Sequence, residues 1–396
     1  MIDYLFWRGD LSFRNDPFNE VDNMLFAQMS YLDFEAYFHE EKYLTLKDLS
    51  KRYFADRDIT QIGTDKNASK SSAYMLYLMA RSKRFEKCRV HDCISETHNE
   101  KDLVERFAAM MIDLDDHTTV VVFRGTDDSL ISWKEDLMLS YRDIASQYDA
   151  LAYVNQRCRF WRRYRFIGHS KGGYLAIYAA AHCNYLLQRR IIEVYSDDGP
   201  GLRSESYDLD KYERIKDRYK LIVPAKDGVG TIYEMAENKK IAQISVFNII
   251  AAHNMMTWQV EGNHVLEADK NAYETDLSRK SILKFLKETN TSQRAVFVEE
   301  FFNVLAEMNI SSVTEFSGPV VISKIMSRMS RMDDEAKSTA GKMIRAFTDN
   351  IGSDLQKSIS DSTEQIRNRF FRKKADDAET KLNQEKETLE EETTEL

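Results

Sequence analysis

The stretch YRFIGHSKGGYLAIYAA, residues 164–180, joins a short apolar run to an alanine-rich run through a turn with one serine among glycines. The first run predicts a β-strand and the second a helix that packs closely on a sheet. A nucleophilic serine needs such a turn, because the turn exposes its hydroxyl to a base and the next amide to a substrate oxygen. Gly168 and Gly172 complete a G-x-S-x-G pattern around Ser170 and relieve crowding there. Ser170 is therefore the candidate nucleophile, the alternative being an ordinary capping serine.

The chain on both sides of this stretch alternates between predicted strands and predicted helices. Residues 104–114 and 118–126 predict a β-hairpin, and strands are expected at 191–196, 220–225 and 244–250. Helical patterns occupy parts of 20–55, about 70–84 and about 146–161. This alternation predicts an α/β fold with a mostly parallel sheet and flanking helices.

The pattern changes beyond residue 266. Strand signals stop, and apolar residues recur at helical spacing, which predicts a helical C-terminal appendage over 267–374 on an α/β domain of residues 1–266. Residues 375–396 hold nine acidic side chains against two lysines, a net charge of −7 within the −9 of the whole chain. We expect this tail to be solvated.

Composition narrows the function classes. With the tail set aside the body is nearly neutral, so nucleic acid is not an expected partner. The chain shows no secretory signal and no apolar run long enough to cross a bilayer, which predicts a cytoplasmic protein with its four cysteines reduced. His91, Cys93 and His98 lie close in sequence, but no second pair completes a metal site, so we expect neither a metal nor a cofactor.

A serine nucleophile needs a base and an acid, expected in the order serine, acid, histidine. His253 and His264 are the histidines placed late enough to be the base, and His253 is closer to a predicted strand end. Asp227 follows the predicted strand at 220–225 and is the preferred acid; Asp197 and Asp198 are the rivals.

An oxyanion formed at Ser170 needs two hydrogen-bond donors. The backbone N–H of Lys171 is the first candidate, at the start of the helix. The second is the Gly125–Thr126 backbone after the strand at 118–123, with the Thr126 hydroxyl as a further donor. The Lys171 ammonium is expected to point to solvent, the alternative being contact with a substrate carboxylate.

The motifs, taken in order, resemble a known family. VVVFRGT (120–126), Trp133 with Asp136, FIGHSKGG (166–173), DGPG (198–201) and the late His253 are similar to the class 3 lipases of the α/β-hydrolase fold. The resemblance is closer to the bacterial Mbeg-like family, through DYLFWRGDLSF (3–13), PFNEVDNMLFAQMSYLDF (17–34) and HNMMTW (253–258). It covers about residues 1–265 and implies Ser170 as nucleophile, His253 as base, Asp227 as acid, and Thr126 with Lys171 at the oxyanion hole.

These observations lead to two functional hypotheses. The first is a serine esterase or lipase that acts on acyl esters through an acyl-enzyme; thioesterase and peptidase chemistry would use the same residues. The second is a hydrolase-fold protein that binds a membrane surface or a partner through residues 343–374, where cations and paired aromatics meet at 367–374. A lid over the site is expected, if anywhere, within residues 200–219.

Overall fold

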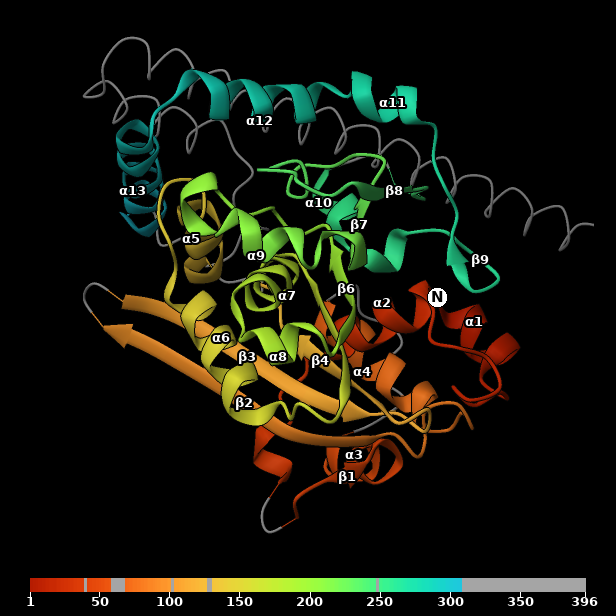
Figure 1. The fold of residues 1–396 in the computed structure, drawn as a ribbon. Helices are drawn as coiled ribbons and strands as arrows, with labels where there is room; N and C mark the ends of the chain where they lie inside the picture. Colours follow the sequence, from red (N-terminus) through yellow and green to blue (C-terminus); the bar gives the residue numbers. More distant parts are fainter. Residues whose placement is uncertain (39–40, 58–67, 101–102, 127–129, 247–248, 308–396) are drawn as a thin grey trace, which may run out of the picture. The chain divides into compact units, whose positions relative to one another are not determined.

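One eight-stranded sheet organises the part of the chain that this computed structural model describes: residues 1–38, 41–57, 68–100, 103–126, 130–246 and 249–307. The strands lie in sequence order. They are β1 (Leu44–Thr45), β2 (Arg89–Glu100), β3 (Leu103–Asp113), β4 (Thr118–Phe123), β5 (Arg163–His169), β6 (Ile191–Asp197), β7 (Tyr219–Pro224) and β8 (Asn238–Ala242). Strands β1 to β4 pair antiparallel, and β4 to β8 pair parallel. Figure 1 shows β2 and β3 as a long hairpin. The chain is an α/β protein.

The sheet separates two hydrophobic cores. Successive side chains of a strand point to opposite faces, and in β4 Val121 and Phe123 enter one core while Val120 and Val122 enter the other. All six side chains of β4 are buried, as expected for a strand covered on both faces.

Helices before the hairpin cover one face of the sheet. They contribute residues to the core that contains Val120. They are α1 (Ile2–Arg8), α2 (Glu20–Met29), α3 (Leu46–Tyr53) and α4 (Ala68–Met79), joined later in the chain by the short pair β9 (Val260–Glu261) and β10 (His264–Val265).

Helices after the hairpin cover the other face, in the core that contains Phe123. They are α5 (Leu130–Met138), α6 (Ala145–Arg157), α7 (Lys171–His182), α8 (Tyr185–Gln188), α9 (Leu209–Glu213), α11 (Lys270–Thr275), α12 (Leu277–Glu288) and α13 (Thr291–Glu307). A further short helix, α10 (Ile249–His253), leads to the candidate base.

One sequence expectation about strands is wrong, and strands β1, β2 and β8 were not predicted. The hairpin and the strands near 191–196 and 220–225 are confirmed, but 244–250 is not a strand: Ile244 makes only an isolated bridge with Trp258, and Ile249 begins α10. The last strand is instead the polar segment β8, which lies at the sheet edge, where lysines commonly replace apolar residues. Its Lys239 and Lys240 pair with Glu234 and Glu20.

All the described residues belong to one compact unit. Helices α11 to α13 continue the core of the α/β body, through side chains such as Tyr273, Phe285 and Phe297. The segments 343–374, 367–374 and 375–396, singled out above, lie outside the described residues. Among the described helices, none has the length and apolar character needed to span a bilayer.

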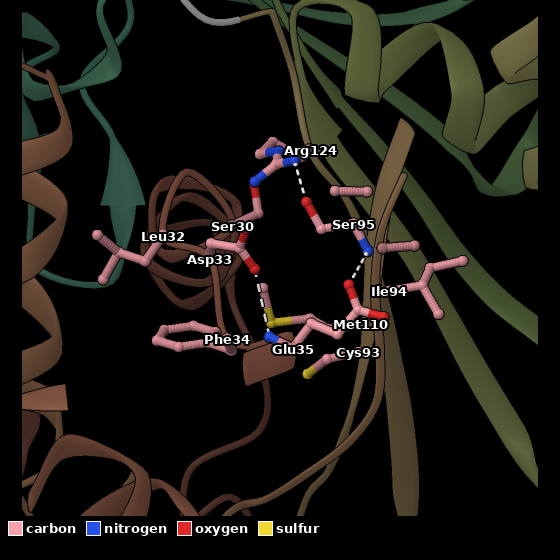
Figure 2. Close-up of a pocket in the computed structure, with 12 residues that line it drawn as sticks. Ser30, Leu32, Asp33, Phe34, Glu35, Cys93, Ile94, Ser95, Met110 and Arg124 are labelled. Carbon is pink, nitrogen blue, oxygen red and sulfur yellow. Dashed lines mark hydrogen bonds between the residues drawn. The ribbon is translucent and has the colours of Figure 1, made fainter. Parts of the chain in front are cut away.

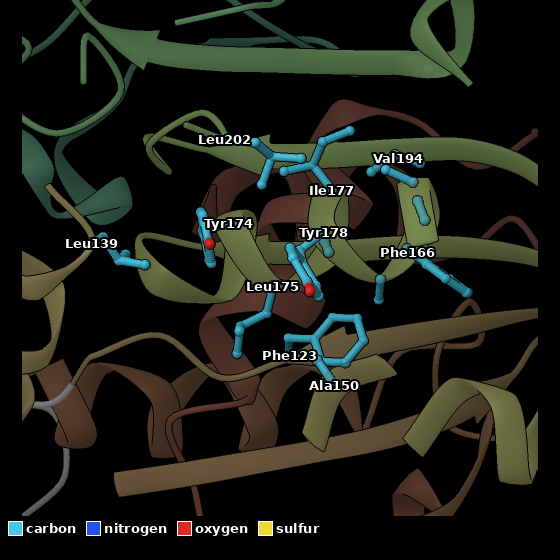
Figure 3. Close-up of a cluster of buried hydrophobic side chains, with 14 of the residues drawn as sticks. Phe123, Leu139, Ala150, Phe166, Tyr174, Leu175, Ile177, Tyr178, Val194 and Leu202 are labelled. Atoms are coloured by element: carbon cyan, nitrogen blue, oxygen red, sulfur yellow. The ribbon is translucent and has the colours of Figure 1, made fainter. Parts of the chain in front are cut away.

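Helix α7 packs most closely on the sheet. Ala176, Ala179, Ala180 and Ala181 are fully buried, and such small side chains let the helix approach the strands. Figure 3 shows the larger side chains that surround this helix, including Phe123 from β4 and Phe166 from β5.

Truncating this packing should destabilise the protein. Phe166 is completely buried, so Phe166→Ala removes its contacts and leaves a cavity that we expect to lower the free energy of unfolding by about 3–5 kcal/mol. Phe160 is 60% exposed, and Phe160→Ala should change the free energy by no more than about 0.5 kcal/mol. Urea denaturation followed by circular dichroism measures both, and equal effects would contradict the core described here.

Candidate active site

The turn at Ser170 holds the candidate nucleophile in a strained conformation. The residue has φ 57° and ψ −128°, between the end of β5 and the first residue of α7. A non-glycine residue with positive φ costs free energy that the surrounding structure must compensate. Here the Ser170 N–H donates to the Asp197 carbonyl at 2.8 Å, and the Ser170 carbonyl accepts from Gly173 N at 2.9 Å. The turn is therefore tied to both β6 and α7.

Two glycines let the turn close. A Cβ atom on Gly168 would lie 2.2 Å from the Gly172 carbonyl carbon, and one on Gly172 would lie 2.2 Å from the Phe123 carbonyl oxygen. Backbone fills the space that a side chain would need at both positions. The G-x-S-x-G spacing is thus required by the contact of α7 with β4 and β5.

The Gly125–Thr126 backbone lies against this turn, as the sequence predicted. A Cβ atom on Gly125 would be 2.4 Å from the His169 carbonyl oxygen. The Thr126 hydroxyl donates to Asp136 Oδ2 at 2.6 Å, so its single proton is already used. This leaves the Thr126 backbone N–H, rather than the hydroxyl, as the donor available to an oxyanion. Burial raises the pKa of Asp136 to about 6.

The expectation that the Lys171 ammonium points to solvent is wrong. The side chain is 1% exposed, and its Nζ donates to Glu135 Oε2 at 2.6 Å and to the Arg106 carbonyl at 2.9 Å. Glu135 also accepts from the Ser146 hydroxyl at 2.5 Å. A buried charge needs a partner, and this ion pair ties the first residue of α7 to α5 and β3. The Lys171 backbone N–H stays in the first turn of α7, where amides lack a helical acceptor.

The carboxylate in contact with His253 is Asp198. His253 Nδ1 is 2.6 Å from Asp198 Oδ2, and Asp198 Oδ1 accepts from Gly230 N at 2.9 Å. Asp198 directly follows β6 and has a positive φ of 49°, which turns its side chain out of the strand path. Burial lowers the pKa of His253 to about 4, so the ring is neutral at pH 7 and can accept a proton. From the sequence, Asp198 was predicted only as an alternative to Asp227.

Asp227, the acid preferred from the sequence, interacts with Asp198 rather than with the His253 ring nitrogen. Its carboxyl group is fully buried and within hydrogen-bonding reach of the Asp198 carboxyl group, and its Oδ2 accepts from the Tyr273 hydroxyl at 2.8 Å. Burial raises the pKa of both acids, and the charge of Asp198 raises that of Asp227 further. The interaction between the two groups lowers the pKa of Asp198, which burial raises to about 7, and raises that of Asp227, so we expect Asp227 to be the acid that keeps its proton. The third candidate acid, Asp197, accepts from Asn23 Nδ2 at 2.8 and 2.9 Å instead.

His169, next to the candidate nucleophile, holds the candidate base in place. Its ring lies 4.5 Å from that of His253, between centroids, and its Nε2 is 2.7 Å from the His253 carbonyl oxygen. Its Nδ1 is 2.5 Å from the Tyr31 hydroxyl. Burial lowers the pKa of His169 well below its usual value, so the ring is neutral, donating from Nε2 and accepting at Nδ1. The other late histidine, His264, is exposed on β10.

Three partners of the site were not identified as such from the sequence. Tyr31, Asp136 and Tyr273 come from segments distant in the chain from Ser170. Tyr31 and Asp136 lie in quoted motifs, where neither was given a role, and Tyr273 lies in none. The earlier metal candidate His91 lies instead 2.8 Å from Asp92 and 3.4 Å from Asp113, while the side chain of His98 is outside the described residues.

Two pockets lie near the segments that build the site. One is lined by the segment after α2, by β2 and β3, and by Arg124, which directly precedes Gly125 (Figure 2). It encloses only about 10 Å³, room for about one water molecule. A larger pocket of about 340 Å³ lies between residues 202–207, 233–235 and the junction of α12 with α13. Its first wall belongs to the expected lid region, residues 200–219, which contains no strand before β7.

Comparison with known proteins gives one family match. A family model described as Mbeg1-like matches residues 79–303. No curated protein matches the chain. Among solved structures, the chain is similar to the one titled "Crystal structure of M37 lipase", with 16% identity, a TM-score of 0.32, and coverage of 54% of this chain and 70% of that chain. That TM-score is too low to assign a fold or a function to this chain.

The buried acid pair predicts a pH-dependent stability. The native protein keeps a proton on Asp227 that the unfolded chain releases above about pH 4. Rising pH therefore lowers the free energy of unfolding by up to about 1.4 kcal/mol per pH unit, until the native pair itself ionises. Asp227→Asn has no such proton, so its melting temperature should fall less than that of the wild type between pH 5 and pH 9. Thermal melts at each pH test this, with exposed Asp115→Asn as the control, and parallel curves for all three proteins would refute it.

Proposed function

The chain belongs to the Mbeg1-like family, and we propose that it is a serine hydrolase with an α/β-hydrolase fold that cleaves acyl esters. The observation that carries the proposal is a serine held at positive φ between a parallel strand and a helix, directly after His169, whose ring lies 4.5 Å from the neutral imidazole of His253. That imidazole contacts a buried carboxylate. A serine with an adjacent base and an acid that orients this base is the standard arrangement for acyl transfer.

The proposed reaction begins at Ser170. Its hydroxyl attacks the ester carbonyl carbon while His253 Nε2 takes the hydroxyl proton, and the same imidazole then protonates the leaving alcohol. Asp198 accepts the Nδ1–H of His253, fixing the tautomer that leaves Nε2 free to accept a proton. Water, activated by His253, attacks the acyl-enzyme and releases the acid.

The negative charge on the substrate oxygen needs donors that are already in place. The Lys171 N–H at the start of α7 and the Thr126 N–H beside the turn are the proposed pair. The hydrogen bond from Thr126 to Asp136 and the ion pair of Lys171 with Glu135 anchor both residues by their side chains, so their amides need not reorganise during the reaction. Thioesters and peptide bonds would be cleaved by the same residues, and a substrate panel separates these three activities.

Labelling by a fluorophosphonate probe tests the nucleophile. We expect the wild type to be labelled and Ser170→Ala to lose labelling completely, because the probe reacts only with an activated serine. Ser204→Ala, at an exposed serine, should be labelled like the wild type. Equal labelling of the wild type and Ser170→Ala would contradict the proposal.

Two matched substitutions test which acid serves His253. Asp198→Asn should lower kcat for p-nitrophenyl acetate by about 10³–10⁴-fold, because an amide can donate to Nδ1 and stabilise the wrong tautomer. Asp227→Asn should lower kcat less than about tenfold, since its amide can donate to Asp198 as the protonated acid does. If Asp227→Asn proved as damaging as Asp198→Asn, the acid would be Asp227; if neither lowered kcat, His253 would not be the base.

A further inference from the structure

An exposed apolar surface lies at the end of the sheet where the central strands β5 and β6 begin. Two segments form it: the loop between α6 and β5, and helix α8 before β6. The exposed fractions of its large side chains are 60% for Phe160, 64% for Trp161, 55% for Tyr185 and 60% for Leu186. The Phe160 and Trp161 rings are 4.9 Å apart at nearly a right angle. Burying such side chains elsewhere would be favourable, so their clustering indicates a contact surface.

The two segments are neighbours in space. Tyr164 N donates to the Arg190 carbonyl at 2.9 Å, and Asn184 N donates to Asn155 Oδ1 at 3.3 Å. In Figure 1, α8 lies beside α6. The four apolar side chains therefore belong to one region of the surface.

Arginines surround these side chains without compensating acids. Arg159, Arg163, Arg189 and Arg190 are exposed, and none of them forms an ion pair with a carboxylate among the residues that the structure describes. No acidic residue occurs within 157–164 or 184–190. We call the four apolar and four arginine side chains the Trp161 patch.

We propose that the Trp161 patch binds an anionic lipid surface. Tryptophan and other aromatic side chains favour the boundary between lipid headgroups and acyl chains, and each arginine near an anionic leaflet adds attraction. The combination of exposed aromatics with arginines that form no ion pair among the described residues fits such a surface.

This docking would orient the molecule. The patch lies where the parallel strands begin, whereas Ser170 and Asp198 lie where β5 and β6 end. The seven residues of β5 span about 23 Å at about 3.3 Å per residue. Ser170 would then face away from the lipid, toward substrates in solution. The inference goes beyond the proposed function, and it stands whether or not Ser170 is catalytic.

Sedimentation of the full chain with vesicles tests the proposal. We expect binding to vesicles of phosphatidylserine and phosphatidylcholine that weakens with added salt, and little binding to phosphatidylcholine alone. Phe160→Ser with Trp161→Ser should abolish most of the binding. Arg159→Gln with Arg163→Gln should weaken it about 25-fold, about fivefold for each charge.

The exposed pair Phe6 and Trp7 on α1 gives a matched control, because Asp3 and Asp10 flank it. Phe6→Ser with Trp7→Ser should bind vesicles as well as the wild type does. If it lost as much vesicle binding as Phe160→Ser with Trp161→Ser, the assignment to the Trp161 patch would be overturned. All variants should keep native circular dichroism. The patch variants should also keep any fluorophosphonate labelling that the wild type shows.

Two further outcomes would overturn the proposal. One is wild-type binding no stronger to anionic than to neutral vesicles. The other concerns the acidic tail of the chain itself: if the wild type failed to bind but Glu390→Gln, Glu391→Gln and Glu392→Gln together restored patch-dependent binding, the occupant of the patch would be residues 375–396.

Discussion

The backbone of Ser170 is the constraint on which the site depends. A serine at φ 57° is tolerated because hydrogen bonds to Asp197 and from Gly173 fix the turn from both sides, at a strain of about 1–3 kcal/mol that the rest of the fold offsets. The turn closes only if α7 touches β4 and β5 through backbone, which explains glycine at 168 and 172. The close packing of α7 and the position of the Lys171 amide in its first turn are thus consequences of the same contact.

Buried charge is arranged around this turn in separate units. Lys171 pairs with Glu135 beneath the start of α7, while His253 contacts Asp198, whose neighbour Asp227 has its pKa raised by burial. Burial and the neighbouring Asp198 raise the pKa of Asp227, so we expect the inner acid to stay protonated and to leave Asp198 as an acceptor for the imidazole. The Tyr273 hydroxyl, on α11, donates to Asp227, so a helix beyond residue 266 contacts the candidate site.

The two ends of the parallel strands carry different properties. The carboxyl ends gather the polar, buried groups of the candidate site, as is general for open α/β sheets. The amino ends of β5 and β6 expose aromatic side chains and arginines that form no ion pair within the part of the chain that the structure describes. Strand β5, about 23 Å long, separates these two surfaces, so contact at one end leaves the other open to solvent.

The sequence by itself determined the α/β class, the hairpin and the turn at Ser170, and it pointed to His253, which contacts a buried carboxylate, because each rests on local periodicity or on a short motif. It failed at β8, where an edge strand carries lysines, and at 244–250, where an apolar run joins no strand. Only the tertiary structure decided which acid contacts His253. Asp197, Asp198 and Asp227 all follow or end buried strands, so their positions in the sequence give little reason to prefer one of them as the partner of His253. The backbone turn at Asp198, with φ 49°, directs that one carboxylate at the imidazole and leaves Asp197 to Asn23 and Asp227 to Tyr273. Side-chain direction at a strand end depends on three-dimensional backbone geometry, which short motifs do not encode.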